Sequence, residues 1–414
     1  MEFLNTISLG QWKRAGRLAL VAALCAALVC PFAAPGGIDA YAATGTNVQA
    51  HSADDIRAYI KASGAKTSDA TKYATTPVTI GPGYNKGSLT QASLDSALKM
   101  LNQIRYIAGI DADVKLDPSQ TELAQGASFI NAVNGQLSHY PTQPADMSQS
   151  LFDLCNSGAQ STNIAWNYGT LGSAILDGWM EDGDSSNIDR VGHRRWMLNP
   201  KMGKTGFGKT GAYTAMYSFD ASRTSSYTGV AWPAQNMPVE YFGAYYPWTF
   251  SVGSSVDGSS VKVVLKRDSD GKSWTFSSAN SDGYFNVNNQ GYGQIGCIIF
   301  RPSDTSYKAG DSFSVTITGA PAPISYKVNF FALEPPTPPQ GNTATDDKNA
   351  ASGKVTKPAA VAVKSVKSKK SRQATITWKP NSEYSGYELL LSTAKNFKKG
   401  KVKAVIKGGK KTKA

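Results

Sequence analysis

With 414 residues and the apolar and aromatic content of an ordinary globular protein, the chain is long enough for two or three domains, at least one of them with a sizeable core. Its net charge of +13 is unevenly distributed, because residues 353–414 carry seventeen Lys and Arg against two Glu, and the rest of the chain is slightly negative. A near-neutral body argues against nucleic-acid binding by the core, which would require a basic face.

Residues 1–42 are expected to be a signal peptide. Basic residues between positions 13 and 17 precede an unbroken apolar run, 18–30, and small residues at 40–42 provide a cleavage site. The apolar run is shorter than the about 20 residues that a membrane-spanning helix needs. We therefore expect a secreted protein with no transmembrane span in the mature chain.

Cleavage near position 42 would leave two cysteines, Cys155 and Cys297. They fall in different predicted domains, so a disulfide bond and two buried thiols are both open at this point. The residues around Cys155 show no sign of an activated thiol, which favours a core residue over a nucleophile.

The segment 43–88 is polar and rich in Thr, Ser, Ala and Gly. We expect it to be a spacer that accommodates a short helix from Asp54 to Lys61. His51 lies in this segment with no periodic pattern beside it, so we expect a solvated side chain.

Helical periodicity begins at position 90. Between Thr90, a predicted N-cap, and Gly109, a predicted stop, apolar residues recur at steps of three and four. They are Leu94, Ala97, Leu98, Leu101, Ile104 and Ala108. A second helix is expected over 117–135, with an Asp cap and a Pro in its first turn, and further helices at 148–155 and 171–181.

The stretch 191–208 places one titratable ring on a tight connection between two ordered elements. His193 lies between a Gly and two Arg, ahead of a short apolar segment that Asn199-Pro200 ends, because the residue before Pro is pushed out of the helical region. Gly206-Phe207-Gly208 then indicates a close backbone approach at the entry to a strand, and 213–219 alternates as a strand.

From about residue 225 the pattern changes to short alternating runs, separated by turn residues at intervals of roughly ten, which is typical of an all-β sandwich. The predicted strands are 248–252, 261–266, 274–277, 284–287, 296–300, 313–317 and 326–331. We assign 223–333 to this domain. Its first aromatic residues are expected to pack against the helical domain rather than to form a binding strip. They are Trp232, Tyr241, Tyr245, Tyr246 and Trp248.

A Pro-rich sequence that begins at Glu334 predicts a linker over 334–357, stiff at first and then flexible. The last segment, 358–414, again predicts strands, at 374–378, 387–392 and 402–406. Its sequence resembles about the first half of a fibronectin type III module. The many Lys residues make anionic cell-wall polymers a candidate partner through long-range attraction, with simple solubilisation as the alternative.

His139 and His193 both lie at turns after helix-forming stretches. They are 54 positions apart, so a shared site and two unrelated, partly exposed histidines are both open. Two other reaction classes lack their motifs, since the chain has no His-Glu-x-x-His and no Gly-x-Ser-x-Gly sequence.

Between residues 89 and 222, about a third of the chain, a set of short motifs occurs in order. They are Ser138-His139, Asn163-Ile164-Ala165-Trp166, Trp179, Gly192-His193-Arg194, Leu198-Asn199-Pro200 and Gly206-Phe207-Gly208. This set resembles a bacterial-type domain of the CAP superfamily, which groups cysteine-rich secretory proteins, antigen 5 and pathogenesis-related 1 proteins. The resemblance implies an α-β-α sandwich. The expected fold class is therefore α+β, with a CAP-type sandwich followed by an all-β sandwich and the partial fibronectin type III-like segment.

The CAP resemblance also implies a central cleft with two histidines, often two acidic residues, and a divalent metal such as zinc. His139 and His193 match the two cleft histidines and are the implied metal ligands, while Asp182 matches one of the acids. The implied cleft-lining positions are Glu181, Asp182, Thr162 and Asn163. Thr162 stands where the family has the other acid, so a metal would have fewer protein ligands and more water. The alternative to a cleft role for Glu181 and Asp182 is that both are solvated acidic residues at the end of a helix.

The family implies binding of a lipid, a sterol, a metal or a protein partner, with no settled reaction. We therefore expect a secreted binding protein at the cell envelope, and leave open whether it is an enzyme. One alternative is a metal-assisted hydrolase of cell-wall or protein substrates, against which the missing acid at Thr162 counts. The other is an adhesin-like protein in which the β-modules make the contacts.

Overall fold

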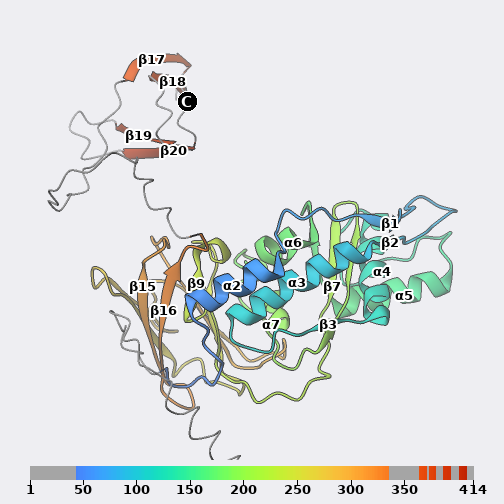
Figure 1. Cartoon of the computed structure of the whole chain (residues 1–414), viewed down its shortest axis with the longest axis horizontal. Coiled ribbons are helices and arrows are strands. Elements are labelled where there is room, and N and C mark those ends of the chain that lie inside the picture. Colours follow the sequence, from blue (N-terminus) through green and yellow to red (C-terminus); the bar gives the residue numbers. More distant parts are fainter. Residues whose placement is uncertain (1–42, 335–362, 371–372, 379–385, 393–400, 408–414) are drawn as a thin grey trace, which may run out of the picture. The chain divides into compact units, whose positions relative to one another are not determined.

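The computed structural model describes residues 43–334 and, farther along, four strands between positions 363 and 407 (Figure 1). The expected signal peptide, 1–42, and the linker from position 335 onward lie outside the described residues. Residues 43–334 belong to one compact unit and the C-terminal strands to another. The helical part and the β-rich part that follows it therefore share a unit.

The described residues form a mixture of helices and strands in several sheets, which confirms the α+β class. Among the helices of this part of the chain, none combines the length and the hydrophobicity needed to span a bilayer.

The segment 43–88, expected to be a spacer, is ordered and packed. It contains α2 (Ala53–Ser63), β1 (Tyr73–Thr75) and β2 (Ser88–Leu89), and α2 lies beside α3 (Gln91–Ile107). The segment is held because Ile56 of α2 is fully buried and Ser52 caps the helix. His51 is likewise not simply solvated, since its ring stacks on Tyr106 of α3 with 3.8 Å between centroids.

A small sheet forms the centre of the helical part. Its strands are β4 (Thr162–Trp166), β7 (Tyr213–Tyr217) and β6 (Phe207–Thr210), antiparallel and in that order. The surrounding helices are α3, α4 (Pro118–Asn134), α5 (Gln149–Ser161), α6 (Leu171–Ser173), the π-helix η1 (Ala174–Trp179) and α7 (Gly192–Met197). A short parallel pair, β3 (Lys115–Leu116) and β5 (Lys204–Thr205), lies before α4 and before β6 in the sequence.

The helix ends follow the predicted capping residues. The Thr90 hydroxyl accepts from the Ser93 N–H at the start of α3, and the Asp117 carboxylate accepts from two N–H groups at the start of α4. Gly135 closes α4 with φ 63°, in the left-handed region that favours glycine. The helix expected at 148–155 extends to Ser161, and the one expected at 171–181 is largely the π-helix η1.

The sheet has a helical layer on each face because its side chains alternate. Ile164 and Ala215 pack with Phe129 of α4 in one cluster. Their sequence neighbours Ala165 and Met216 pack instead in the larger cluster that contains α3 and η1. The result is an α-β-α arrangement.

The predicted close approach at Gly206-Phe207-Gly208 is confirmed. A Cβ atom at Gly206 would lie 2.1 Å from the Thr121 nitrogen, and one at Gly208 would lie 2.3 Å from the Ala124 oxygen. Only glycine lets strand β6 and helix α4 approach this closely.

All seven strands predicted for the β-rich part are present, in two sheets. One sheet is β13 (Gly283–Asn288), β14 (Cys297–Pro302), β10 (Trp248–Ser251) and β8 (Val230–Trp232). The other is β12 (Ser273–Phe276), β11 (Lys262–Arg267), β15 (Ser312–Thr318), β16 (Ile324–Phe331) and β9 (Asn236–Pro238), with the short 3-10 helix η2 (Val239–Tyr241) after β9. Ring contacts such as Phe276–Phe300, at 5.2 Å, join the inner faces of the two sheets.

Of the aromatic residues at the start of this part, Tyr241 and Tyr246 contact the helical part as expected, whereas Trp248 packs on rings of the β-rich part itself. Trp232 and Trp248 are fully buried, and the Tyr241 hydroxyl donates to Gln103 of α3 at 2.7 Å. The Tyr246 hydroxyl donates to a backbone carbonyl of η1 at 3.0 Å. Tyr245 differs, since it is 76 % exposed.

In the C-terminal unit, β17 (Val363–Lys370) pairs with β18 (Gln373–Trp378), and β19 (Gly386–Ser392) pairs with β20 (Lys401–Lys407), all antiparallel. The three strands predicted here are present, and β17 was not predicted. Two hairpins of this kind do not define a fibronectin type III module, which stays a prediction.

Candidate functional site

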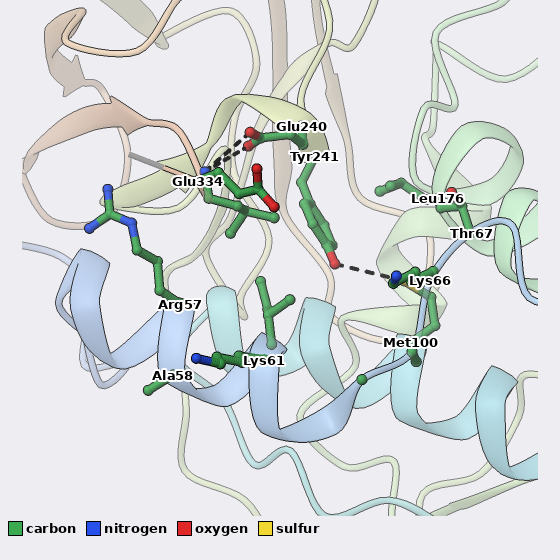
Figure 2. Close-up of a pocket in the computed structure, with 14 residues that line it drawn as sticks. Arg57, Ala58, Lys61, Lys66, Thr67, Met100, Leu176, Glu240, Tyr241 and Glu334 are labelled. Atoms are coloured by element: carbon green, nitrogen blue, oxygen red, sulfur yellow. Dashed lines mark hydrogen bonds between the residues drawn. The ribbon is translucent and has the colours of Figure 1, made fainter. Parts of the chain in front are cut away.

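Among the cavities formed by residues 43–334, two of similar size differ in chemistry. One, of about 740 Å³, lies between α2, α3 and η2 and is lined by Arg57, Lys61, Lys66, Glu240 and Glu334 among others (Figure 2). It contains no histidine or cysteine and none of the predicted site residues. The other, of about 650 Å³, contains both His139 and His193, and we take it as the candidate site.

We call this second cavity the His cleft; its lining includes His139, Tyr140, Thr162, Asn163, Asn187, His193, Trp196, Phe219, Gln290 and Tyr292. These residues come from the segment after α4, the start of β4, the loop before α7, α7 itself, the end of β7 and the loop between β13 and β14. Two imidazoles from distant parts of the sequence therefore face one solvent-accessible space.

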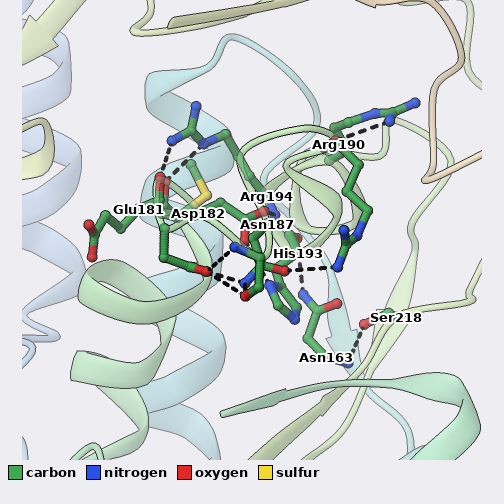
Figure 3. A network of polar contacts seen from close by, with 12 residues as sticks. Asn163, Glu181, Asp182, Asn187, Arg190, His193, Arg194 and Ser218 are labelled. Carbon is green, nitrogen blue, oxygen red and sulfur yellow. Dashed lines mark hydrogen bonds and ion pairs between the residues drawn. The ribbon is translucent and has the colours of Figure 1, made fainter. Parts of the chain in front are cut away.

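His193 is oriented by a buried carboxylate (Figure 3). Its Nδ1 lies 2.8 Å from Oδ1 of Asp182, which is only 2 % exposed, and Oδ2 of Asp182 accepts from the Arg194 N–H at 3.1 Å. The carboxylate thus holds both the ring and the start of α7. No hydrogen-bond partner of His193 Nε2 occurs within residues 43–334.

His139 is held by a different acceptor. Its Nδ1 lies 2.6 Å from the Ala159 carbonyl oxygen at the end of α5. Because a carbonyl only accepts, Nδ1 carries the hydrogen, and Nε2 is left with its lone pair. This nitrogen, too, has no partner in the described part of the unit.

The two rings differ in their affinity for protons. Burial lowers the pKa of His193, but the charge and the hydrogen bond of Asp182 outweigh it, so the pKa of His193 is raised above 6.5. Burial lowers the pKa of His139, the Ala159 carbonyl partly opposes this, and His193 adds a further small lowering. His139 is therefore the ring that stays neutral to lower pH.

Two residues beside the cleft have unusual backbone angles. Asp182 has φ 47°, and Val191, the residue before α7, has φ 43°. Positive φ is a marked outlier for a β-branched side chain, and Val191 is fully buried. Such conformations persist where surrounding contacts impose them and cluster at functional sites.

The other predicted cleft residues have structural tasks at the wall. The Thr162 hydroxyl donates to the Gly158 carbonyl at 2.9 Å, where α5 ends and β4 begins. The Asn163 amide donates to the His193 carbonyl oxygen at 3.0 Å and fixes α7 against β4.

Glu181 does not line the His cleft. Its carboxylate points away from His193 in Figure 3, and burial together with the nearby Asp184 raises its pKa. Of the two adjacent acids, only Asp182 contacts a histidine, His193, and neither acid is among the residues that line the His cleft.

Arg194 and Arg195 are buried, which no pattern in the sequence indicated. The Arg194 guanidinium donates to the carbonyls of Met180 (2.8 Å), Glu181 (2.6 Å) and Pro247 (2.5 Å). Burial lowers the pKa of Arg194 to about 10, so it stays charged at neutral pH. It therefore joins η1 and α7 to the start of the β-sandwich.

Arg195 makes the corresponding contacts with the loop between β13 and β14. Its guanidinium donates to the carbonyls of Gln290 (2.5 Å) and Gln294 (2.7 Å) and to the Asn288 side chain (2.8 Å). These contacts place the loop residues Gln290 and Tyr292 in the wall of the His cleft.

Cys155 and Cys297 are both free and buried. Burial raises the pKa of the Cys155 thiol to about 12, which confirms a core residue and not an activated nucleophile.

Comparison of the chain with protein-family models, with curated proteins and with solved structures gives no match. Within the described residues, no group of three or more His, Cys, Asp or Glu side chains is placed to hold a metal ion. A metal in the His cleft would therefore have two protein ligands, His139 and His193.

Proposed function

We propose that the chain is a secreted protein of the CAP superfamily whose His cleft binds a divalent cation and, with it, a ligand. The α-β-α arrangement around β4-β7-β6 supports the family proposal. The observation that carries the functional proposal is the convergence of His139 and His193 on one cleft, each with Nε2 unpaired among the described residues.

The surroundings of the two rings fit a metal. A metal-binding histidine usually donates its other ring N–H to a carboxylate or a backbone carbonyl, which fixes the tautomer and the ring orientation. His193 has the Asp182 carboxylate in this role, and His139 has the Ala159 carbonyl. Zinc suits imidazole nitrogen and tolerates coordination positions completed by water or by a ligand.

Two protein ligands leave open positions, which favours ligand binding over a closed structural site. Asp182 does not serve as a further ligand, because both of its oxygens accept hydrogen bonds from the His193 ring and the Arg194 backbone. The chain's own residues thus orient two metal-binding nitrogen atoms and keep the space in front of these atoms open to solvent.

The test is zinc binding, measured by calorimetry and by elemental analysis after dialysis. We expect one zinc per chain for the wild type and for His51→Ala, whose ring stacks on Tyr106 and lies outside the His cleft. The double variant His139→Ala/His193→Ala should retain none. Unchanged zinc content in the double variant, with an unchanged circular dichroism spectrum, would refute the proposal.

The second candidate is a metal-assisted hydrolase, and the Asp182–His193 pair favours it. A histidine held by a buried carboxylate can accept a proton from a water molecule during hydrolysis. Incubation with peptidoglycan and with casein tests this, since turnover that disappears in His193→Gln would establish the hydrolase. Binding without turnover supports the first candidate.

We further propose that the protein acts at the cell envelope. The segment 353–414, with its seventeen Lys and Arg, would add attraction to anionic wall polymers, and a lipid or sterol is a further candidate ligand of the cleft. In the adhesin-like alternative the β-modules make the contacts. Loss of zinc and of ligand binding in His139→Ala/His193→Ala would speak against that alternative.

A further inference from the structure

One wall of the His cleft is aromatic. The Trp196 ring lies 4.7 Å from the Phe219 ring and 6.3 Å from the Tyr292 ring, measured between centroids, so the three rings are contiguous. Phe219 is 50 % exposed, and Tyr140, which lines the same cleft, is 80 % exposed. Exposed rings gathered in one concave surface mark a binding site more often than scattered ones do.

This wall is built by both halves of the compact unit. Trp196 belongs to α7 and Phe219 follows β7, whereas Tyr292 comes from the loop between β13 and β14 of the β-sandwich. The loop approaches α7 so closely that a Cβ atom at Gly192 would lie 3.1 Å from the Tyr292 ring. The aromatic wall therefore exists only when the sandwich is docked on α7.

The aromatic wall is also held in place before any ligand arrives. The Arg195 guanidinium, 5.2 Å from the Tyr292 ring centroid, donates to two backbone carbonyls of the same loop, those of Gln290 and Gln294. A fixed loop loses little conformational freedom on binding, which favours affinity.

The remaining lining of the His cleft is polar. Its amide and charged side chains include Asn163, Asn187, Asp189, Arg190 and Gln290. A purely apolar ligand such as a fatty acid or a sterol would cover these groups without giving them hydrogen bonds, which is costly. A ligand with one apolar face and many hydroxyl groups matches both kinds of wall.

From this combination we infer that the His cleft binds a carbohydrate, as an extended chain of equatorially linked pyranose rings. The C–H faces of such rings are flat and stack on the negative faces of aromatic rings. Phe219 and Tyr140 are the exposed rings of the cleft, beside Trp196 and Tyr292, which meet edge to face. The hydroxyl groups around the rim of each sugar bond to planar amide and charged side chains. The inference shares the cleft of the proposed function but does not depend on the metal.

The experiment uses N-acetylchitohexaose and cellohexaose as probes, with binding followed by tryptophan fluorescence and by calorimetry in the presence of either zinc or EDTA. We expect the wild type to bind at least one of the two. Phe219→Ala and Tyr140→Ala remove exposed rings, so the fold should survive, and each should weaken binding by about tenfold, the loss of one ring contact. Tyr245→Ala removes a ring of similar exposure that does not line the His cleft, and should bind within twofold of the wild type.

Three results would overturn the inference: no binding of either hexasaccharide by the folded wild type, equal binding by all three variants, or retention of myristate or a sterol in place of the sugars. His139→Ala/His193→Ala separates this inference from the proposed function. Loss of zinc with sugar binding kept supports both. Absence of zinc from the wild type with sugar binding present refutes the metal site alone.

Discussion

Two contacts within the compact unit differ in kind: that of strand β6 with helix α4, and that of helix α7 with the β-sandwich. Toward α4, Gly206 just before strand β6 and Gly208 within it let two backbones meet with almost no side chain between them. Toward the β-sandwich, α7 and its surroundings are joined through the buried guanidinium groups of Arg194 and Arg195. The first contact depends on the lack of side chains at two glycines, and the second depends on hydrogen bonds from arginine side chains to backbone carbonyls.

The difference explains where the candidate site lies. At the glycine contact the backbones of β6 and α4 touch, so no cavity can lie between them. Long polar side chains, in contrast, can hold two surfaces together with a cleft between them. The His cleft lies at this second junction, with histidines from the helical part and Tyr292 from the sandwich. The junction should therefore control both stability and ligand binding.

The largest effect is expected for Arg194→Leu. Removal of the guanidinium leaves three backbone carbonyls without their donors, and each such acceptor costs about 1–3 kcal/mol when it stays buried. We expect the free energy of unfolding, measured with urea, to fall by about 3–5 kcal/mol. Arg267→Leu, which breaks an exposed pair with Asp270, serves as the control and should change it by at most about 1 kcal/mol. Equal losses in the two variants would contradict the structural role of Arg194.

At the other contact, Gly208→Ala should cost about 1–3 kcal/mol, because its Cβ would collide with the α4 backbone. Gly169→Ala is the matched control, since a Cβ there meets nothing within 4 Å. It should leave the free energy of unfolding within about 0.5 kcal/mol of the wild-type value. A harmless Gly208→Ala would show that α4 and β6 are not in close contact.

Arg195→Lys should have a smaller effect on stability, about 1–2 kcal/mol, because the charge is kept but the planar fork that serves several acceptors is lost. The effect should be local: amide hydrogen exchange should accelerate in residues 289–294 and stay unchanged in α4. Acceleration spread over the whole unit would mean that Arg195 supports the fold in general and not this loop.

The smallest effect is the pH dependence that His193 contributes. Because its folded pKa is raised above 6.5, the protonated ring stabilises the fold fully below about pH 6.5, and this contribution is lost as the pH rises through the folded pKa. The stability difference between wild type and His193→Gln should therefore be largest near pH 5 and shrink toward pH 8, by about 1 kcal/mol, the net size of a typical hydrogen bond. A difference that grows with pH would refute the His193–Asp182 contact.

His139 acts in the opposite direction in that experiment. Its pKa is lowered, so below about pH 6.5 the unfolded chain takes up the proton more readily and stability falls. Both proteins retain His139, so this contribution largely cancels in the comparison.

Much of the local structure could be predicted from the sequence. Thr90, Asp117 and Gly135 mark helix ends because capping is decided within one turn of the chain. The seven strands of the sandwich follow from alternation, and the glycines before and within β6 marked the contact with α4. Each of these signals extends over a few residues, and so the sequence alone determined them.

What the tertiary structure decided concerns partners far apart in the chain. Nothing near Arg194 in the sequence indicates that its acceptors include Pro247, and nothing near Tyr292 indicates that it faces His193 across a cleft. The same holds for Asp182 and Glu181, adjacent acids of which only Asp182 contacts His193. Hydrogen bonds from long side chains to backbone carbonyls carry no residue-type pattern, because every residue offers the same carbonyl, and only the folded arrangement selects among them.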